Sequence, residues 1–170
     1  MMPRRSQRFG KYRGTVVNNV DPQDLGRIQL MIPDVYGATP APWAMPCTPV
    51  AAAGAGMIAI PPIGATVWVE FERGDDDHPI WVGGFWPTAA EFPRSILSSP
   101  FFGIAFKTPG GHSLVISDAP GPAGGIVLRT AAGAALTFND TGIHISNGQG
   151  ASVTLVGPTV SVNNDALEVT

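Results

Sequence analysis

The segment "FKTPGGHSLVISDAPG", residues 106–121, decides the fold of the carboxyl-terminal part of this chain. Between two proline–glycine turns it holds five residues in which Leu114 and Ile116 alternate with smaller or polar residues. Side chains alternate between the two faces of a strand, so both apolar residues fall on one face. The segment therefore predicts a short strand with one apolar face.

The same pattern recurs up to residue 169. Successive strands are expected to start roughly 7 to 12 residues apart, separated by Gly, Asn or Asp. This is a loose repeat, which we interpret as architecture and not as a series of sites. The seven apolar pairs are Leu114/Ile116, Ile126/Leu128, Leu136/Phe138, Ile143/Ile145, Val153/Leu155, Val160/Val162 and Leu167/Val169.

Seven such strands in a flat meander would leave their apolar face wet and two edges unpaired. Three closures are possible. A single-chain β-solenoid needs about 20 residues per turn and would give only three thin coils. The meander could fold over itself as a sandwich, or three identical chains could wrap around a threefold axis with the apolar pairs inward. The residues alone leave the sandwich and the trimer open.

The preceding part of the chain, from residue 12 to residue 86, has longer and more aromatic strand candidates. Val67, Val69 and Phe71 are expected on one face of such a strand, opposite Trp68 and the glutamates. About five strands without a helix predict a small barrel, most simply an OB-type Greek key. The strands are expected at 12–20, 26–33, 65–73 and 79–86, with a hairpin loop at 73–80.

Composition favours an all-β protein. The chain holds 21 Gly and 17 Pro, and only 14% of its residues are charged, against about 25% in a typical soluble domain. The longest stretch without Gly or Pro, residues 159–170, alternates with period two, so no helix is expected. We predict a basic arm, an OB domain, a linker and a shaft, at 1–11, 12–86, 87–103 and 104–170.

The charge distribution gives little reason to expect nucleic acid, since the net charge is −3. Half of the ten basic residues lie at the amino terminus, namely Arg4, Arg5, Arg8, Lys11 and Arg13. They could form a solvated arm or an arm that docks on an acidic partner. No apolar h-region follows them, so no signal peptide is expected. Residues 50–60 are too short to span a bilayer, and the single Cys47 excludes an internal disulfide.

Several spaced motifs occur in an order that resembles a known family. They are Asp21-Pro22 followed by Gly26-Arg27, the turn at 60–64, and the run 71–75 that leads to His78-Pro79-Ile80. Residues 12–86 resemble the amino-terminal OB domain of phage baseplate assembly protein V, which VgrG proteins of type VI secretion share. The segment from "KTPGGHSLVISDAPG" to "NNDALEV" resembles the β-helical shaft that follows that domain.

The resemblance implies the threefold closure. The chain would be an intertwined homotrimer with all seven apolar pairs in its core, serving as the central spike of a contractile injection system or myophage tail baseplate. Such a spike joins a hub to a tip and helps to pierce the target envelope, with transient contact with the target membrane. The resemblance also implies assembly in the cytoplasm as part of a particle that can be released extracellularly.

Two partners follow from the same resemblance. Because the chain reaches its barrel by about residue 12, a separate hub protein is expected on the amino-terminal side. A PAAR-type tip protein is expected at the other end, where the chain stops without a polar capping repeat. The expected tip-docking residues are Ala166, Leu167, Glu168, Val169 and Thr170.

Candidate chemistry is weak. Glu70 and Glu72 are expected on the same side of a strand and could form a catalytic pair, but a solvated face is the simpler interpretation. The aspartates at 75–77 could bind a divalent cation, although adjacent turn aspartates are expected to diverge. The three histidines, His78, His112 and His144, are scattered, and neither Ser113 nor Cys47 has a nucleophile motif. We predict no catalytic residue, no metal, no cofactor and no enzymatic activity.

Two other functions are kept as alternatives. An OB module for single-stranded nucleic acid would need a basic groove with stacking aromatics, yet residues 26–33 offer only Arg27 and no aromatic side chain. A tail-associated hydrolase is the other alternative, although the 17-residue linker at 87–103 is too small to hold an enzyme domain.

Overall fold

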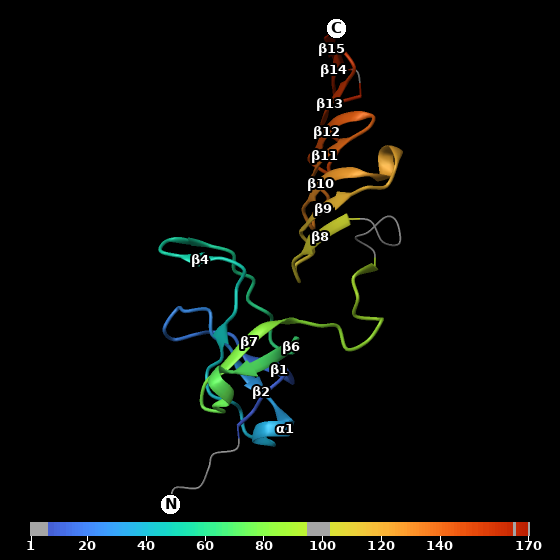
Figure 1. Cartoon of the computed structure of the whole chain (residues 1–170). Coiled ribbons are helices and arrows are strands. Elements are labelled where there is room, and N and C mark those ends of the chain that lie inside the picture. The colour runs from blue at the N-terminus through green and yellow to red at the C-terminus, as the bar shows by residue number, and fades with distance from the viewer. Residues whose placement is uncertain (1–6, 95–102, 165, 170) are drawn as a thin grey trace, which may run out of the picture. The chain divides into compact units, whose positions relative to one another are not determined.

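A computed structural model of the chain describes residues 7–94, 103–164 and 166–169. The described residues are almost entirely strands and turns, as expected for an all-β protein. The chain divides into two compact units, residues Met1–Phe92 and Pro93–Thr170 (Figure 1). The predicted basic arm falls partly outside the described residues, at 1–6, and so does the predicted linker, at 95–102.

The first unit is a five-stranded sheet in the order β2-β1-β6-β7-β3. Isolated bridges from Ile28 to Ala44 and from Met31 to Pro40 join the two ends of that order, so the sheet closes into a barrel. All neighbours are antiparallel except β3 and β7. The strands are β1 (Tyr12–Asn18), β2 (Gln29–Met31), β3 (Met45–Pro46), β6 (Thr66–Phe71) and β7 (Pro79–Gly84).

The barrel core confirms the alternation read from β6. Val67, Val69 and Phe71 are buried, while Trp68 between them lies on the other face and is only half-buried. The strand is shorter than predicted, because it ends at Phe71 and a 3-10 turn, η1 (Glu72–Gly74), follows, within which Arg73 has a φ of 54°. Other buried residues of the core are Val16, Ile28, Leu30, Ile32, Ala41, Ala44 and Trp81.

One short helix departs from the expectation of none. Residues 26–33 were predicted as one strand, but the strand ends at Met31 and α1 (Pro33–Tyr36) follows. Proline fixes φ near the helical value and lacks the N–H that a first helical residue cannot use, so Pro33 suits the start of a helix. The Tyr36 hydroxyl then donates to the carbonyl of Asp76, and its ring packs edge-on against Phe71.

A small hairpin projects from the barrel and was not predicted. It consists of β4 (Ala51–Ala52) and β5 (Ala55–Gly56), which share two paired positions (Figure 1). Every residue from 50 to 60 is exposed. Residues 50–60 are called the arm below, as distinct from the basic arm predicted at residues 1–11.

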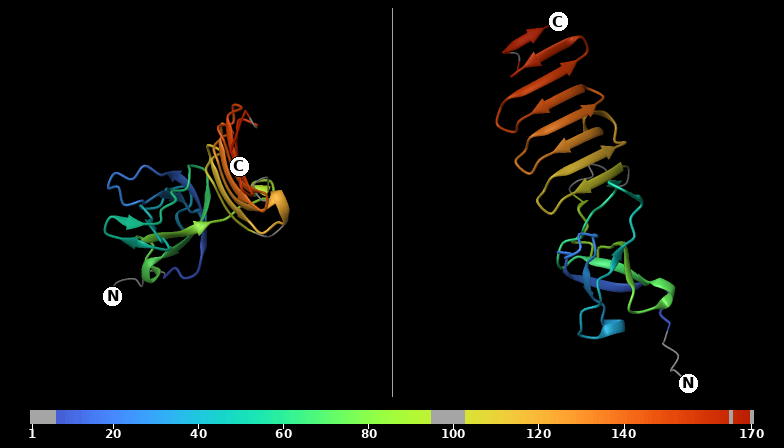
Figure 2. Two further views of the ribbon diagram at one scale, coloured as in Figure 1. Left: turned by 90° about the horizontal axis from the view of Figure 1, so that it is seen from above. Right: turned by 90° about the vertical axis from the view of Figure 1, so that its left-hand side faces the viewer.

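The second unit is an eight-stranded antiparallel sheet in which every strand pairs with its neighbours in the chain. The sheet is curled across its width (Figure 2). It contains one strand more than the seven apolar pairs predicted, because β8 carries a further pair, Ile104 and Phe106. The strands are β8 (Gly103–Lys107), β9 (Ser113–Ser117), β10 (Gly125–Arg129), β11 (Ala135–Asn139), β12 (Gly142–Ser146), β13 (Ser152–Val156), β14 (Thr159–Val162) and β15 (Leu167–Val169).

Glycines at the start of β10 and β12 let these two strands pack closely against their neighbours in the sheet. A Cβ atom on Gly125 would lie 1.9 Å from the carbonyl oxygen of Phe138, and one on Gly142 would lie 2.1 Å from that of Leu155. Both glycines also have a positive φ, 90° and 142° respectively. No other residue fits these two strand starts without backbone movement.

Candidate assembly surface

The strand registers arrange the apolar pairs of the second unit in two continuous rows. Directly paired residues of neighbouring strands point to the same face, and so do residues two apart within a strand. The first row is Ile104, Ile116, Ile126, Phe138, Ile143, Leu155 and Val160, with Val169 next in register. The second row is Phe106, Leu114, Leu128, Leu136, Ile145, Val153, Val162 and Leu167.

This apolar face is open to solvent in the single chain. Leu128 is 46% exposed, Phe138 39% and Ile145 46%, whereas Val69 in the barrel core is 0% exposed. Apart from Gly124, the buried residues in the described part of the second unit are instead Val115, Ser117 and Ser161, which alternation places on the opposite face. The unit therefore presents a large apolar surface that a single chain does not cover.

The opposite face has a middle row of smaller or more polar residues. His144 lies in this row between Thr137 and Thr154 in register, away from Ile143 and Ile145, as the alternation predicts. Its Nε2 atom is 2.9 Å from the Thr141 hydroxyl. The two faces thus differ in polarity as expected, while the assignment of the fourteen apolar residues to a trimer core stays a prediction.

The expected tip-docking residues lie on β15 and just before it. β15 forms one edge of the sheet. Ala166 and Leu167 are exposed, and Glu168 and Val169 continue the strand. Thr170 lies outside the described residues. The assignment of these residues to tip docking stays a prediction.

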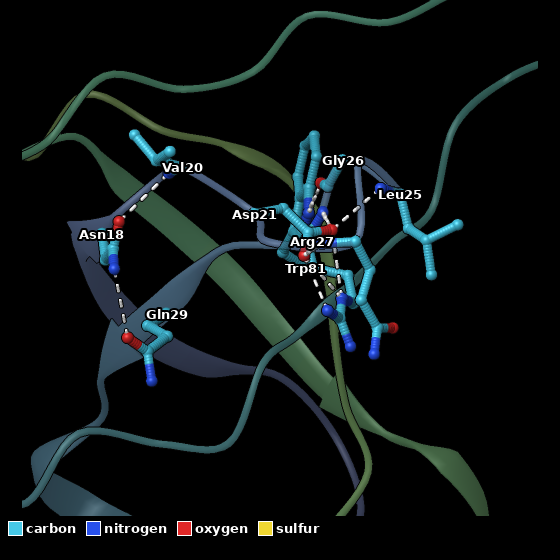
Figure 3. A network of polar contacts seen from close by, with 9 residues as sticks. Asn18, Val20, Asp21, Leu25, Gly26, Arg27, Gln29 and Trp81 are labelled. Carbon is cyan, nitrogen blue, oxygen red and sulfur yellow. Dashed lines mark hydrogen bonds and ion pairs between the residues drawn. The ribbon is translucent and has the colours of Figure 1, made fainter.

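The Asp21-Pro22…Gly26-Arg27 motif forms a tightly bonded loop (Figure 3). The Asp21 carboxylate accepts hydrogen bonds from the backbone N–H groups of Gln23, Leu25 and Arg27, at 3.0, 2.9 and 3.1 Å. Arg27 Nη2 also lies 2.6 Å from Asp21 Oδ1. The Arg27 guanidinium holds the pKa of the Asp21 carboxyl well below its usual range, and the backbone N–H groups act in the same direction.

The loop is also fastened to the barrel. The Arg27 guanidinium lies 5.6 Å from the centre of the Trp43 ring, and Trp81 Nε1 donates to the Gly26 carbonyl at 3.3 Å. Pro22 and Gly26 are residue types that favour a turn, and Gly26 has a positive φ of 74°. The central role of Asp21 was missed by sequence reasoning.

A second cluster that sequence reasoning missed lies on the outer side of β1 and β6. The Arg13 guanidinium is 5.5 Å from the Trp68 ring and 5.3 Å from the Phe85 ring, and the two ring centres are 4.5 Å apart. The aromatic faces are thus already occupied by a cation of the same chain. Beside them, Lys11 Nζ lies 2.5 Å from Glu70 Oε1.

The candidate catalytic and metal-binding residues do not form a convincing centre. Glu70 is paired with Lys11, and Glu72 belongs to η1 and not to the strand, so the two glutamates do not share a strand face. The expectation that the three aspartates diverge is wrong: one carboxylate oxygen from each of Asp75, Asp76 and Asp77 lies within 4.8 Å of the others. Such exposed acidic groups commonly gather without an ion, and we assign no metal to them.

The three histidines make local contacts. His78 Nδ1 is 3.3 Å from an Asp75 oxygen, and His112 Nδ1 accepts from the Ala131 N–H at 3.4 Å.

Among the described residues, no helix is long and apolar enough to cross a membrane.

Comparison with known families accounts for both units. Residues 12–86 match the family model described as the type VI secretion system/phage-baseplate injector OB domain. Residues 103–168 match the one described as the phage baseplate V C-terminal trimerisation domain. No curated protein matches the chain. The barrel is therefore an OB domain, the curled sheet is a trimerisation domain, and the chain belongs to the phage baseplate V family of structural, VgrG-like baseplate spike proteins.

Proposed function

We propose that three copies of this chain form the central spike that joins a hub to a tip in a contractile injection machine and helps to pierce the target envelope. The observation that carries the proposal is the exposed apolar face of the trimerisation domain. Its two rows run through the entire sheet without a charged residue among them. A face of this kind needs a permanent cover.

The energy available from that cover is large. Burying a Leu or Ile side chain completely contributes about 1.5–3 kcal/mol, so covering the exposed half of such a side chain contributes about 1 kcal/mol. Each chain carries two rows of eight residues, and three chains are covered together, so the total free energy is many times this figure. Folding of the shaft would be coupled to assembly, which favours slow unfolding, and the short turns between strands suit a stiff and narrow shaft.

The two ends of the spike are proposed to bind different partners. We place the hub on the side of the OB domain, because that domain precedes the shaft. We place a PAAR-type tip protein at β15, an edge strand with an open row of N–H and C=O groups that carries the exposed side chain of Leu167. Contact with the target membrane would be transient and confined to penetration.

Light scattering on the purified full-length chain tests the trimer. The expected mass is three times the chain mass of 17.7 kDa. A folded monomer would refute the proposal. Tryptophan fluorescence reports on folding of the OB domain in the same sample, because all four tryptophans lie in that domain and Trp81 is buried, so that misfolding is recognised.

Deletion of residues 163–170 tests the tip. The shortened chain should still be a trimer but should lose a co-expressed PAAR protein from the same source, which the full-length spike retains. Equal retention by both trimers would show that the tip binds elsewhere.

Neither alternative function gains support from a specific contact. Arg13 lies over the half-buried aromatic pair of Trp68 and Phe85, and Arg27 is bonded to Asp21, so neither cation is available to a nucleic-acid backbone without breaking a contact. The families matched are structural, and we infer a non-enzymatic role. A fluorescent oligonucleotide at low salt, where electrostatic binding is strongest, should show no binding to the trimer.

A further inference from the structure

The OB domain carries a second uncovered apolar surface, separate from the face of the shaft. Residues 35–69 contain no Asp, Glu, Lys, Arg or His. Exposed side chains of this stretch and of the neighbouring loop form what we call the arm surface. It comprises Val20, Leu25, Val50, Met57, Ile58 and Ile63, whose exposed fractions run from 48% for Met57 to 76% for Val20.

Two contacts fasten the base of the arm to the neighbouring loop. A Cβ atom on Gly26 would lie 3.2 Å from Ile58 Cδ1, so the arm rests against the loop that contains Leu25. Asn19 Nδ2 donates to the Pro61 carbonyl at 3.1 Å, which ties the same loop to the segment after the arm. The bonds of Asp21 hold this loop in one conformation. The base of the arm surface is therefore well ordered and not a set of scattered apolar residues.

The arm itself is too small to hold its shape unaided. β4 and β5 share two paired positions, Ala51 with Gly56 and Ala52 with Ala55, and one further bond joins the Met57 N–H to the Val50 carbonyl. An isolated two-stranded hairpin is at best marginally stable in water, even when it is longer. Its Ala and Gly residues contribute little packing of their own, but they let another backbone approach closely. These features fit a segment that is covered by a neighbour.

We propose that the arm surface packs against a second copy of the chain, so that the OB domains of one spike contact one another through their arms. This inference rests on the proposed homotrimer. It assigns a role to residues outside the segment that matches the trimerisation domain.

A second copy fits the surface better than a transient partner for three reasons. Permanent interfaces between identical chains are more apolar and poorer in charge at their core than transient ones. The ten residues 93–102 span at most about 35 Å, so a trimerised shaft keeps the three OB domains at an effective concentration of the order of millimolar. An apolar surface left open until another protein arrives would also promote aggregation.

The test uses the full-length chain with Cys47→Ser, so that introduced thiols react alone. Ala53→Cys places a thiol at the tip of the arm, and Ala38→Cys places one at another exposed alanine, outside the arm. The rate of reaction with a thiol reagent is measured on the purified trimer. We expect the arm thiol to react at least 10-fold more slowly than the control thiol. Adding Ile58→Asp should make the two rates equal, while the mass stays that of a trimer.

The outcomes separate the two proposals. A monomeric mass would refute the homotrimer and this inference with it. A trimer in which both thiols react equally fast would overturn the arm contact alone, and so would slow reaction that Ile58→Asp does not relieve. Shielding that appears only when the hub protein is added would assign the arm surface to the hub and would also overturn the inference.

Discussion

Leu128→Asp should abolish assembly of the spike. Leu128 lies in the second row of the apolar face, directly between Leu114 and Leu136 in register. It is 46% exposed in the single chain, so the isolated chain tolerates a polar side chain at this position far better than a closed trimer does. The neighbouring residue Arg129 lies in the same strand on the other face and is exposed, which makes Arg129→Ser the matched control.

The magnitude follows from the exposed fraction. Covering the exposed half of Leu128 contributes about 1 kcal/mol per copy, or about 3 kcal/mol per trimer. Leu128→Ala should therefore weaken the association constant of the trimer about 100-fold, since 1.4 kcal/mol corresponds to a factor of ten. Leu128→Asp adds the desolvation of a carboxylate, several kcal/mol per ion, and brings three like charges together, for a total of about 10 kcal/mol or more.

The assay is light scattering after gel filtration, followed by electrophoresis in detergent with and without heating. The parent and Arg129→Ser should run as trimers that resist detergent, since a change at an exposed position usually alters stability by no more than about 0.5 kcal/mol. Leu128→Asp should elute as a monomer whose OB domain keeps the tryptophan fluorescence of the parent, since all four tryptophans lie in that domain and Trp81 is buried. A trimer of Leu128→Asp as resistant as the parent would refute the inward orientation of the row.

Three further predictions concern single residues. Gly125→Ala should destabilise the shaft by about 1–3 kcal/mol or more, because its Cβ would lie 1.9 Å from a carbonyl oxygen; Gly150→Ala, with a positive φ but open space, should lower the melting temperature much less. Asp21→Asn should destabilise the OB domain at pH 7. The pKa of Asp21 in the folded protein is below its ordinary value of about 3.9, so the carboxylate contributes its full stabilisation above pH 3.9 and loses it on acidification. In urea unfolding, the difference in free energy of unfolding between the parent and Asp21→Asn should therefore shrink from pH 5 towards pH 2. Burial, with a smaller effect of nearby aspartates, raises the pKa of Tyr36 to about 12. The neutral hydroxyl therefore contributes its full stabilisation below pH 10 and loses it between pH 10 and 12. Tyr36→Phe should remove that part of the alkaline loss of stability, and a free energy of unfolding that falls with pH as in the parent would contradict the assignment.

Sequence periodicity predicted the shaft well because its strands share one pattern, in which apolar residues alternate with smaller or polar ones. The pairs Leu114/Ile116 and Ile143/Ile145 alternate with period two, and their registers place them in the two rows. The strand β8 was missed because its single pair, Ile104 and Phe106, directly follows a proline-rich stretch without periodicity. In the barrel, the strand expected at 26–33 ends at Met31, and Pro33 begins a helix instead, since its ring favours the first helical turn.

The contacts that fasten the OB domain were harder to predict. Besides the Arg27 guanidinium, the partners of Asp21 are three backbone N–H groups, which leave no mark on the sequence beyond the turn itself. The stack of Arg13, Trp68 and Phe85 joins residues far apart in the chain, and alternation says nothing of which strands become neighbours. The arm was missed for another reason: strands with two paired positions are too short to give a periodic signal.

The strict pairing of each strand with its neighbours in the chain makes the length of the shaft adjustable. Removing or adding two consecutive strands restores the direction of the chain, keeps both apolar rows in register and leaves the cross-section unchanged. A single strand cannot be removed in this way, because the next strand would then run in the opposite direction and its connection would have to cross the sheet. The reach of the spike can therefore change in steps of one hairpin, without a new fold or a new interface at either end.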